Sequence, residues 1–460
     1  MNTNFYAGFG QREITPEKMT RLAGYDLRKE AAVGVHDPLF TRVVSMAEES
    51  LHTALLIEVD LLGTAVYLCQ RIRSAVIRRL TGLLDLSPEA IQIGAIHTHA
   101  APQSVFQAFD CYDDEYLDFI AECCAQAAED AFHDLHPVRA AICENTMPGV
   151  GSFRDVSREE AGFSMPVKGL WLEALPDQDV EESQSAPVSP ILVAHFACHP
   201  TVLNEQNLLI SRDLVWGAEQ VLKDQIAAWQ AEGRPAPPMP RILWMNGACA
   251  DISTRFTRQA ATFEEAKRLG ARLMGSFRYP QETEWAEKVS LTCQAETLAV
   301  PPAHFFTKEE RQEILTYLTD KIDNCTDNAR KREYEACRSV LKREHYGEGK
   351  GTVAQLSLIE LTLEKPDPFS VSHRKVLTET LDILGIPFEY AQRDAVKLAG
   401  KISTMYGKRA WIRCYTEGYE GYLPSGRPLD RDSGYEDMAS GYAAEAKTLL
   451  ANAVLGLVQL

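Results

Sequence analysis

Three short apolar segments of the sequence each run directly into a polar loop, and this repetition constrains the fold most strongly. The loops carry His97 and His99 after 91–96, His199 after 191–198, and Asp251 and Ser253 after 241–246. Short apolar runs of this length are typical of buried strands, and open α/β sheets bind ligands at the carboxyl ends of their strands. The repetition therefore predicts an α/β fold with a mixed β-sheet core, flanking helices and a site at the strand ends.

His97 and His99 lie at the centre of the first of these loops. Successive side chains of an extended chain alternate between faces, so residues two apart point the same way. Two imidazoles on one side of a strand end suit a metal site or a proton-transfer site. The motif alone does not choose between these uses and an ordinary strand-end histidine, and the same holds for His199 before Pro200.

The segments around these loops alternate between strand and helix patterns. Strand patterns cover 43–46, 54–62, 138–175 and 354–363, and helical spacing of apolar residues covers 70–84, 116–132, 216–229 and 437–457. A further helix start is expected at Ser87 and Pro88, because Ser is a favoured N-cap and Pro suits the first helical position. Alternation of strands and helices is typical of α/β proteins.

Residues 306–345 differ from the rest of the chain in composition. They are rich in Lys, Arg and Glu, with apolar residues every three or four positions. This spacing predicts helices, and the charges are expected to form a solvated face. We expect a helical insertion that covers one edge of the site, within a single large domain of residues 1–460.

Composition narrows the classes of function. The 460 residues carry a formal net charge of −18, which argues against a nucleic-acid or anionic-membrane partner. No run of about 18 apolar residues occurs, so no transmembrane segment is predicted, and the first residues lack a signal-peptide pattern. The 11 cysteines are scattered, which favours free thiols in a reducing compartment. A cytoplasmic protein is expected.

Seven short motifs occur in order along nearly the whole chain. They are Gly8-Phe-Gly with Ile14-Thr-Pro16, Gly34-Val-His-Asp-Pro-Leu39, His97-Thr-His99, Cys198-His-Pro-Thr201, Asn246-Gly-Ala-Cys-Ala-Asp251, Pro387-Phe-Glu389, and Gly421-Tyr-Leu-Pro424 with Gly434-Tyr-Glu436. Together they resemble the neutral/alkaline non-lysosomal ceramidase family. The resemblance implies a zinc-dependent hydrolase that cleaves the carbon–nitrogen bond of a small-molecule N-acyl amide.

The resemblance also implies a set of site residues. The implied ligands of Zn²⁺ are His97, His199, Glu389 and Tyr422, and the implied catalytic residues are His99, Tyr435 and Arg154. Two imidazoles, a carboxylate and a fourth oxygen are compatible with zinc that keeps a position for water. His99 and Tyr435 are expected to contact the substrate carbonyl.

The implied reaction is metal-assisted amide hydrolysis. Zinc lowers the pKa of its bound water towards about 7, and the hydroxide attacks the amide carbon. Asp37, Asp60 and Asp213 are candidates for orienting the ligand histidines as hydrogen-bond acceptors. His36 lies in the polar corner Gly34–Pro38, and Asp60 ends a predicted strand. Both are further candidates for the site.

Three loops depart from the family pattern. Ala100-Ala-Pro102 follows the His-Thr-His motif, the third strand-end loop reads Ala250-Asp-Ile-Ser-Thr254, and Phe153 precedes Arg154. These loops shape the pocket, so the resemblance does not fix the substrate. Because no signal-peptide pattern is present either, a soluble amide is expected rather than ceramide in a membrane. The chain also ends soon after the catalytic region, so the C-terminal β-sandwich domain of long family members is not expected.

Two other functions compete with this interpretation. A serine hydrolase would use Ser253 as the nucleophile with a histidine as base, but no Gly-x-Ser-x-Gly elbow is present. A non-catalytic binding protein on the same fold is the other alternative. The presence of all four candidate zinc ligands argues against a binding protein, which has no need of an open metal site.

Overall fold

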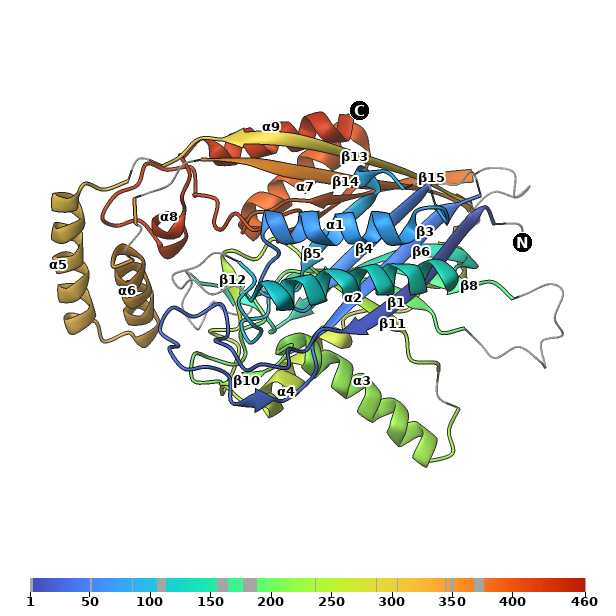
Figure 1. Cartoon of the computed structure of the whole chain (residues 1–460), viewed down its shortest axis with the longest axis horizontal. Coiled ribbons are helices and arrows are strands. Elements are labelled where there is room, and N and C mark those ends of the chain that lie inside the picture. The colour runs from blue at the N-terminus through green and yellow to red at the C-terminus, as the bar shows by residue number, and fades with distance from the viewer. Residues whose placement is uncertain are drawn as a thin grey trace.

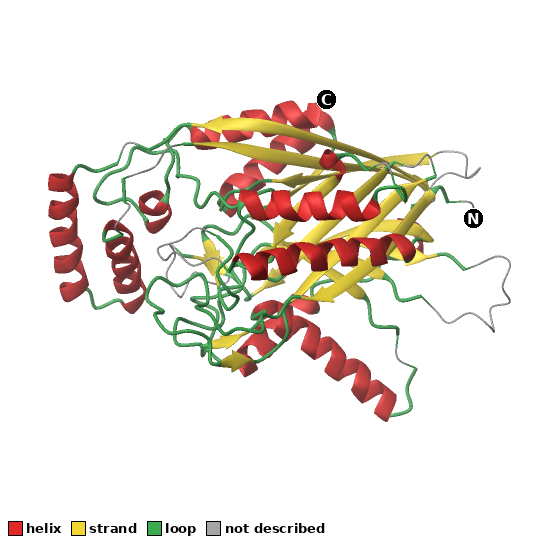
Figure 2. Ribbon diagram, in the orientation of Figure 1, coloured by secondary structure: helices red, strands yellow, loops and turns green. Residues whose placement is uncertain are grey.

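The computed structural model describes residues 3–49, 52–84, 86–105, 113–154, 164–176, 188–235, 237–286, 288–303, 305–343, 346–347, 351–367 and 376–459. Two β-sheets form the centre of the molecule, and helices cover their outer faces (Figures 1 and 2). Among these residues, no helix is long and apolar enough to cross a membrane.

The larger sheet has eight strands in the order β11-β9-β8-β6-β1-β3-β4-β5. Its strands are β1 (Phe5–Glu13), β3 (Phe40–Glu48), β4 (Thr53–Val59), β5 (Ile91–Ala95), β6 (His136–Pro148), β8 (Ser164–Ala174), β9 (Ile191–Phe196) and β11 (Arg241–Asn246). The pairs at the two ends, β4–β5 and β9–β11, are parallel, and the pairs between them are antiparallel. This confirms the predicted mixed sheet.

The smaller sheet has the order β13-β14-β15-β16 and packs face to face on the larger one. Its strands are β13 (Lys288–Val300), β14 (Thr352–Pro366), β15 (Val376–Gly385) and β16 (Arg409–Arg413). The layer between the sheets consists of buried alternating side chains, among them Val44, Leu56 and Val193 on one side and Ile359, Leu361 and Trp411 on the other. Burial of both inner faces stabilises the pair of sheets as one core.

Helices cover the outer faces. On the larger sheet lie α1 (Val66–Leu80), α2 (Asp114–His133), α3 (Leu214–Ala231) and α4 (Phe263–Met274), and on the smaller sheet α7 (Gln392–Tyr406) and α9 (Ala446–Gln459) (Figure 1). Helices α3 and α4 meet at Gly217 and Gly270, where a Cβ atom would overlap the backbone of the other helix. The predicted flanking helices are confirmed, although the predicted C-terminal helix begins at Ala446.

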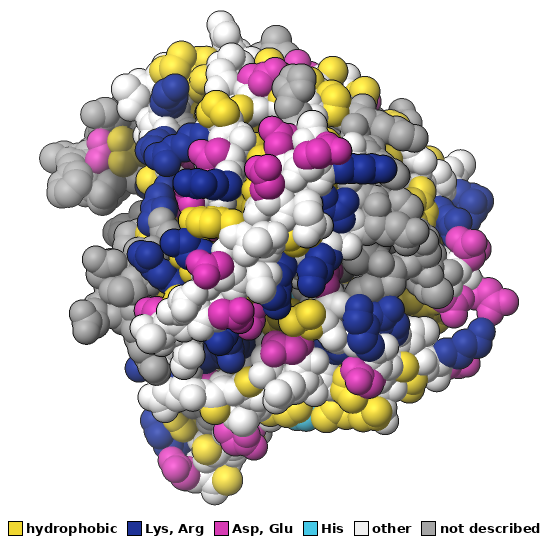
Figure 3. Space-filling view, turned by 90° about the vertical axis from the view of Figure 1, so that its left-hand side faces the viewer, with side chains coloured by type: hydrophobic (Ala, Val, Ile, Leu, Met, Phe, Trp, Pro, Cys, Tyr) yellow, Lys and Arg dark blue, Asp and Glu magenta, His cyan; other side chains and the backbone are white. Residues whose placement is uncertain are grey.

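Helices α5 (Lys308–Asn324) and α6 (Asn328–Leu341) lie between β13 and β14 in the chain and project from one end of the molecule (Figure 1). Thr307 and Glu310 form a capping box at the start of α5. The two helices share a small apolar cluster with α8 (Tyr435–Ala439). On this face, Lys and Arg are interspersed with Asp and Glu (Figure 3), which agrees with the helices and solvated charges predicted for 306–345.

The helix expected at Ser87 is a single 3₁₀ turn, η1 (Pro88–Ala90). The sequence signals for a helix start are present, but β5 begins at the next residue, Ile91, and its apolar side chains are all buried in the sheet. Pairing with β4 therefore outweighs helix propagation. A second 3₁₀ turn, η3 (Glu282–Glu284), precedes β13.

The two edges of the larger sheet converge at the carboxyl ends of their strands. Asn246, at the end of β11, donates Nδ2 to the carbonyl oxygens of Ile96 (3.1 Å) and Cys198 (3.2 Å). Isolated bridges Gly94–Thr416 and Gly247–Arg413 connect the same edges to the segment around β16. The loops that follow β5 and β9 therefore meet, even though these two strands are far apart in the strand order.

Short strands complete the loop region at this end. They pair as β2 (Gly34–Val35) with β10 (Leu209–Ile210), and β7 (Ser152–Phe153) with β12 (Ile252–Ser253). Strand β12 also forms a parallel bridge between Ser253 and His199. These pairings fix the loops that carry the candidate functional residues.

Candidate metal centre

His97 lies in a strained backbone conformation just beyond the end of β5. Its φ of 69° is in the left-handed region, which a non-glycine residue adopts at an energetic cost. The amides of His97 and Thr98 both donate to the carbonyl of Leu61 (2.9 and 3.2 Å), which holds this turn. The prediction from strand alternation was therefore wrong in its mechanism, because a turn and not an extended strand brings His97 and His99 together.

His97 and His199, both buried, are oriented by backbone carbonyls. Nδ1 of His97 lies 2.7 Å from the carbonyl oxygen of Leu62, and Nδ1 of His199 lies 2.8 Å from that of Cys249 and 3.0 Å from that of Ile252. A carbonyl only accepts hydrogen bonds, so Nδ1 carries the proton in each neutral ring. Each Nε2 therefore presents a lone pair to the interior of the site.

Glu389 supplies a third acceptor at the same point. It follows the end of β15, and its Oε2 lies 3.2 Å from Nε2 of His199 and 3.8 Å from Nε2 of His97. Its other oxygen, Oε1, accepts a hydrogen bond of 2.6 Å from the hydroxyl of Tyr419. Oε2 of Glu389 and Nε2 of His199 are both buried, and neither has a hydrogen-bond partner in the part of the chain that the structure describes.

Three acceptor atoms that face one another in a buried site fit a metal cation. Ligand atoms around a tetrahedral zinc with bonds of 2.0–2.1 Å are about 3.3 Å apart; Oε2 of Glu389 lies 3.2 Å from Nε2 of His199, and its distance of 3.8 Å from Nε2 of His97 is somewhat longer. A proton on an imidazole is disfavoured here, because burial lowers the pKa of His97 to about 3 and that of His199 well below its ordinary value. The donor set therefore fits the implied Zn²⁺.

His99 completes a group of three imidazoles. Its Nε2 lies 3.3 Å from Nε2 of His97, and ring nitrogens of His97, His99 and His199 lie within 4.8 Å of one another. Gly24, with φ of 95°, packs directly on the His99 ring, where a Cβ atom would overlap it. Nδ1 of His99 has no hydrogen-bond partner among the described residues. His99 is thus able to serve as a ligand or to face the substrate.

Arg154 connects the predicted tyrosines to the site. Its Nη1 donates to the hydroxyl oxygen of Tyr422 (3.2 Å) and pairs with Glu436 (3.4 Å). Tyr422 forms an isolated parallel bridge with Glu389, and its ring lies edge-on to that of Tyr435, with centroids 5.4 Å apart. All four side chains from the C-terminal motifs therefore gather beside the histidines.

Two further tyrosines support the centre, and sequence reasoning did not assign them. Tyr415 stacks on the ring of His97 with centroids 3.9 Å apart, and its hydroxyl contacts Sγ of Cys249 (3.1 Å). Tyr419 fixes the carboxylate of Glu389. The tyrosine-rich composition of residues 415–424 was the available signal, but it does not say which ring contacts which ligand.

The carboxylates expected to orient the ligand histidines have other partners. Asp37 binds Ser211 and Arg212, Asp60 accepts from the amide of Phe40, and Asp213 accepts from the amides of Val202 and Leu203. This prediction was wrong, because backbone carbonyls already occupy both Nδ1 positions. Asp213 acts indirectly, since it holds the loop that follows His199.

His36 also lies apart from the three histidines. It pairs with Asp37 and stacks on Phe263, with ring centroids 3.4 Å apart. Its neighbours are residues of the α3–α4 region, such as Trp216. It therefore packs as an ordinary partly buried histidine.

Ser253 lacks the contacts of a serine nucleophile. Its hydroxyl oxygen accepts from the backbone amide of Arg255 (3.3 Å). The Nδ1 atoms of His97 and His199 bind carbonyls, and Nε2 of His199 faces Glu389. The geometry therefore gives no support to the serine-hydrolase alternative.

A cavity of about 260 Å³ adjoins the centre. Its lining includes His99, Tyr422 and Tyr435 on the side of the histidines, together with Arg154 and Ser253. The predicted catalytic residues thus share one cavity with a predicted ligand. A small molecule in this cavity would contact the partly exposed ring of His99.

Solved structures of ceramidases share this fold. Neutral ceramidase from Pseudomonas aeruginosa superposes with a TM-score of 0.69 over 100% of this chain and 74% of that chain, at 14% sequence identity. A ceramidase complexed with C2 gives a TM-score of 0.66 over 99% of this chain and 75% of that chain, also at 14% identity. No protein-family model and no curated protein matches the sequence. The chain therefore has the fold of the neutral ceramidases, as the ordered motifs predicted.

Proposed function

We propose that this protein is a metal-dependent hydrolase of carbon–nitrogen amide bonds, with Zn²⁺ as its metal. The proposed substrate is a small-molecule N-acyl amide, the class that includes ceramide. The ceramidase fold supports the reaction class. We further propose that residues 1–460 act as one catalytic domain, with α5 and α6 as an insertion.

One observation carries this proposal. The lone pairs of His97 Nε2 and His199 Nε2 and the free oxygen of Glu389 converge, and no hydrogen-bond donor of the described residues lies between the histidines and the carboxylate. Buried acceptors that face one another repel unless a proton or a cation lies between them. A cation is the better match, because burial disfavours the imidazolium form.

Each residue has a separate part in the proposed reaction. His97, His199 and Glu389 hold the metal, and Tyr422 is the proposed fourth ligand, oriented by Arg154. The metal when bound supplies a Lewis acid and lowers the pKa of water. Water then adds to the amide carbon, the carbon–nitrogen bond breaks, and a carboxylate and an amine leave.

His99 and Tyr435 are proposed to bind the substrate carbonyl. Both line the cavity beside the centre. Burial raises the pKa of Tyr435 to about 12, so its hydroxyl keeps its proton at neutral pH and can donate to an oxyanion. His99 is neutral at that pH, because burial lowers its pKa well below the ordinary value, and it can donate from one ring nitrogen.

The proposal is tested by metal content and amide hydrolysis in the same preparations. Untagged protein purified without chelator is measured for metal by elemental analysis. The same protein is measured for release of the amine and the carboxylic acid from N-acyl amides that range from C2-ceramide to short soluble amides. About one zinc per chain is expected, with activity that chelator removes and zinc restores. The H97A variant is expected to lose both metal and activity.

A matched control is H36A, because His36 is a partly buried histidine outside the centre. This variant is expected to keep its metal and its activity. A protein that binds no metal even after zinc is added, or that hydrolyses amides equally well as H97A, would contradict the proposal. Activity in the presence of chelator would have the same meaning.

A further inference from the structure

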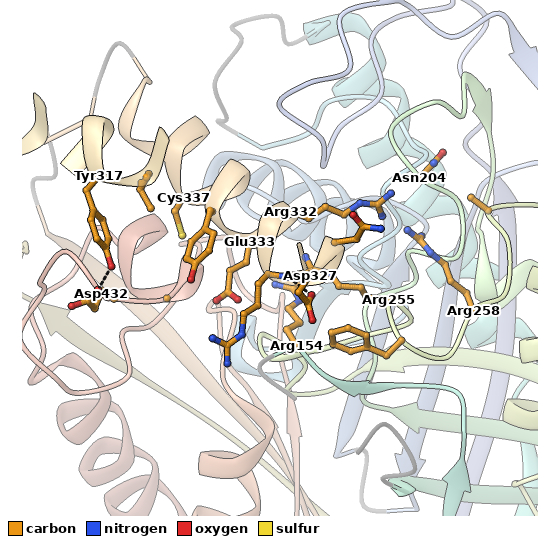
Figure 4. A pocket seen from close by; sticks show the side chains of 18 of the residues that line it. Arg154, Asn204, Arg255, Arg258, Tyr317, Asp327, Arg332, Glu333, Cys337 and Asp432 are labelled. Atoms are coloured by element: carbon orange, nitrogen blue, oxygen red, sulfur yellow. Dashed lines mark hydrogen bonds between the residues drawn. The ribbon is translucent and has the colours of Figure 1, made fainter. Parts of the chain in front are cut away.

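The cavity beside His99 adjoins a larger cavity of about 860 Å³, and arginines line both. Arg154, Arg255, Arg258 and Arg332 belong to both linings. The first three follow β7 and β12, the short strands that pair beside His199, and Arg332 belongs to α6. Figure 4 shows Arg255 between Arg154 and Arg258 in this view, with α6 opposite.

Arg255 carries a charge that the described part of the chain leaves without a partner. It is half-buried, and its guanidinium makes no hydrogen bond or ion pair with described residues; only its backbone amide binds, to Ser253. Burial and the neighbouring Arg154 lower the pKa of Arg255, and Glu333 and Glu436 compensate only in part. A guanidinium in this environment is destabilising until an anion binds it.

The arginines beside it add positive charge in the same place. Arg258 donates Nη1 to the carbonyls of Thr201 (2.5 Å) and Val202 (3.0 Å), which fixes its position without neutralising its charge. Arg332 is exposed on α6, and among the described residues its side chain makes no hydrogen bond or ion pair. Arg255 thus lines both cavities together with Arg258, which two carbonyls hold in place, and Arg332, which no described residue binds.

Part of the acidic lining is already paired. Asp26 binds Arg343 (2.8 Å), and Glu436 binds Arg154 (3.4 Å). Glu205, Glu333 and Glu335 also line the smaller cavity. Among the described residues, Arg154 and Arg343 have carboxylates at ion-pair distance, whereas Arg255, Arg258 and Arg332 do not.

The lining does not suit a long hydrocarbon chain. Leu27 and Ala336 are its aliphatic side chains among the described residues of the smaller cavity. The remaining side chains are charged, hydroxyl-bearing or aromatic. A short polar substrate matches this surface better than a long-chain lipid does.

We propose that the amide substrate carries an anionic group, and that Arg255, with Arg258 and Arg332 beside it, binds this group. The inference rests on the proposed hydrolase function and names its substrate class. Carboxylate, sulfonate and phosphate groups share the required chemistry, and a planar carboxylate matches the two-pronged guanidinium best. Hydrolysis adds one water and yields a carboxylate and an amine, and one of these two products keeps the anionic group that Arg255 binds.

Matched substrates test the inference on the metal-loaded protein. N-hexanoylglycine and the monoisobutylamide of adipic acid carry a carboxylate on the amine half or the acyl half, and N-hexanoylisobutylamine is a neutral counterpart of the first. N-hexanoyltaurine tests a sulfonate, and N-hexanoyl-phosphoethanolamine tests a phosphate. We expect kcat/KM for at least one anionic amide to exceed that for the neutral amide about tenfold or more, with weaker preference at high salt.

The R255Q variant is expected to lose this preference, with KM for the anionic amide raised about tenfold or more and the neutral amide affected less than about threefold. R255K is expected to restore part of the preference. R234Q is the matched control, since Arg234 is exposed and pairs with Glu232 away from the cavities. Melting temperature and zinc content are measured for every variant, and R332Q serves if R255Q does not fold.

Binding is measured separately, so that the two proposals can fail independently. The ketone analogue of hexanoylglycine, in which a methylene replaces the amide nitrogen, is titrated by calorimetry against its neutral counterpart. Tighter binding of the anionic ketone that R255Q abolishes supports the anion site even if no amide is hydrolysed. Equal affinity for charged and neutral ligands, or an unchanged preference in R255Q, overturns it even if amides are cleaved.

Discussion

Glu389 uses its two oxygens for different purposes. Oε1 accepts the hydroxyl of Tyr419, and Oε2 is left free toward His97 and His199. The hydrogen bond fixes the carboxylate rotamer, so the free oxygen already points toward the two histidines before a metal binds. Loss of a residue that orients a ligand in this way typically weakens metal binding about ten- to a hundredfold.

The Y419F variant is therefore expected to bind zinc about ten- to a hundredfold more weakly than the wild type. The ring stays in place, and only the hydroxyl that donates to Glu389 is lost. Competition with a fluorescent zinc chelator measures the affinity. Y406F is the control, because the hydroxyl of Tyr406 in α7 donates to the carbonyl of Leu455 in α9 and not to a residue of the metal centre. Equal affinity in Y419F and the wild type would contradict the orienting role.

His99 and Tyr422 are the two candidates for the fourth ligand of the metal. The ring of His99 lies in the three-histidine group, whereas the hydroxyl of Tyr422 is held by Arg154. We expect Y422F to weaken zinc binding and H99A to keep zinc while kcat falls, because His99 is proposed to act on the substrate. Metal affinity and kcat are measured for both variants. Loss of zinc in H99A with normal binding in Y422F would reverse the two assignments.

Sequence reasoning predicted which histidines lie together better than it predicted their geometry. The ordered motifs pointed to His97, His99 and His199, which the structure brings together. The left-handed turn at His97 could not be predicted, because it depends on carbonyls of residues 61 and 62 on another segment. Tyr415 was missed for the same reason, since its stacking partner is more than 300 positions away.

At the scale of single elements, a buried charge network docks α3 on the larger sheet. Glu219 of α3 pairs with Arg42 of β3 (3.0 Å) and with Arg212 (2.6 Å), and it accepts from the indole of Trp244 (2.8 Å). Burial alone would raise the pKa of Glu219, but the two guanidinium groups outweigh it and lower the pKa to about 2. The ionised carboxylate therefore stabilises the fold.

The E219Q variant is expected to be about 3 kcal/mol less stable than the wild type at pH 7. Because the pKa is lower in the folded state, this stabilisation is complete above about pH 4.5 and is lost as the pH falls toward 2. Urea unfolding of both proteins at pH 7, 5, 4 and 3 measures the difference. A difference that stays constant down to pH 3 would show that the carboxylate charge is not responsible.

Helices α5 and α6 depend on a small apolar cluster of their own. Leu318, Cys337 and Val340 pack there with Met438 of α8, the helix that begins with Tyr435. The candidate zinc ligands come from other elements. Disorder in this cluster should therefore affect the substrate cavity and leave the metal centre in place.

The L318A variant is expected to destabilise α5, α6 and α8 locally by about 2–5 kcal/mol. Hydrogen exchange in these helices should become faster, and KM should rise, while zinc content stays at the wild-type level. Exchange followed by mass spectrometry, together with elemental analysis, measures both effects. If zinc were lost as well, the insertion would be part of the metal centre.

Across the whole molecule, the centre exists because two distant sheet edges converge. Asn246 bonds to the carbonyls of Ile96 and Cys198, each directly before a ligand-bearing loop. The sequence predicted both strands correctly, but their positions near opposite ends of the strand order depend on pairings among eight strands. The mixed fold was thus predictable from local patterns, and the closure that unites the loops was not.

An anomalous difference map, collected at the zinc edge from crystals of the protein grown with zinc, tests the central claim most directly. We expect one strong peak bound by His97 Nε2, His199 Nε2 and Glu389 Oε2 at about 2.0–2.2 Å, with Tyr422 as the fourth protein ligand. No peak there, with the three side chains arranged as in the structure above, would contradict the proposal that these residues hold a metal.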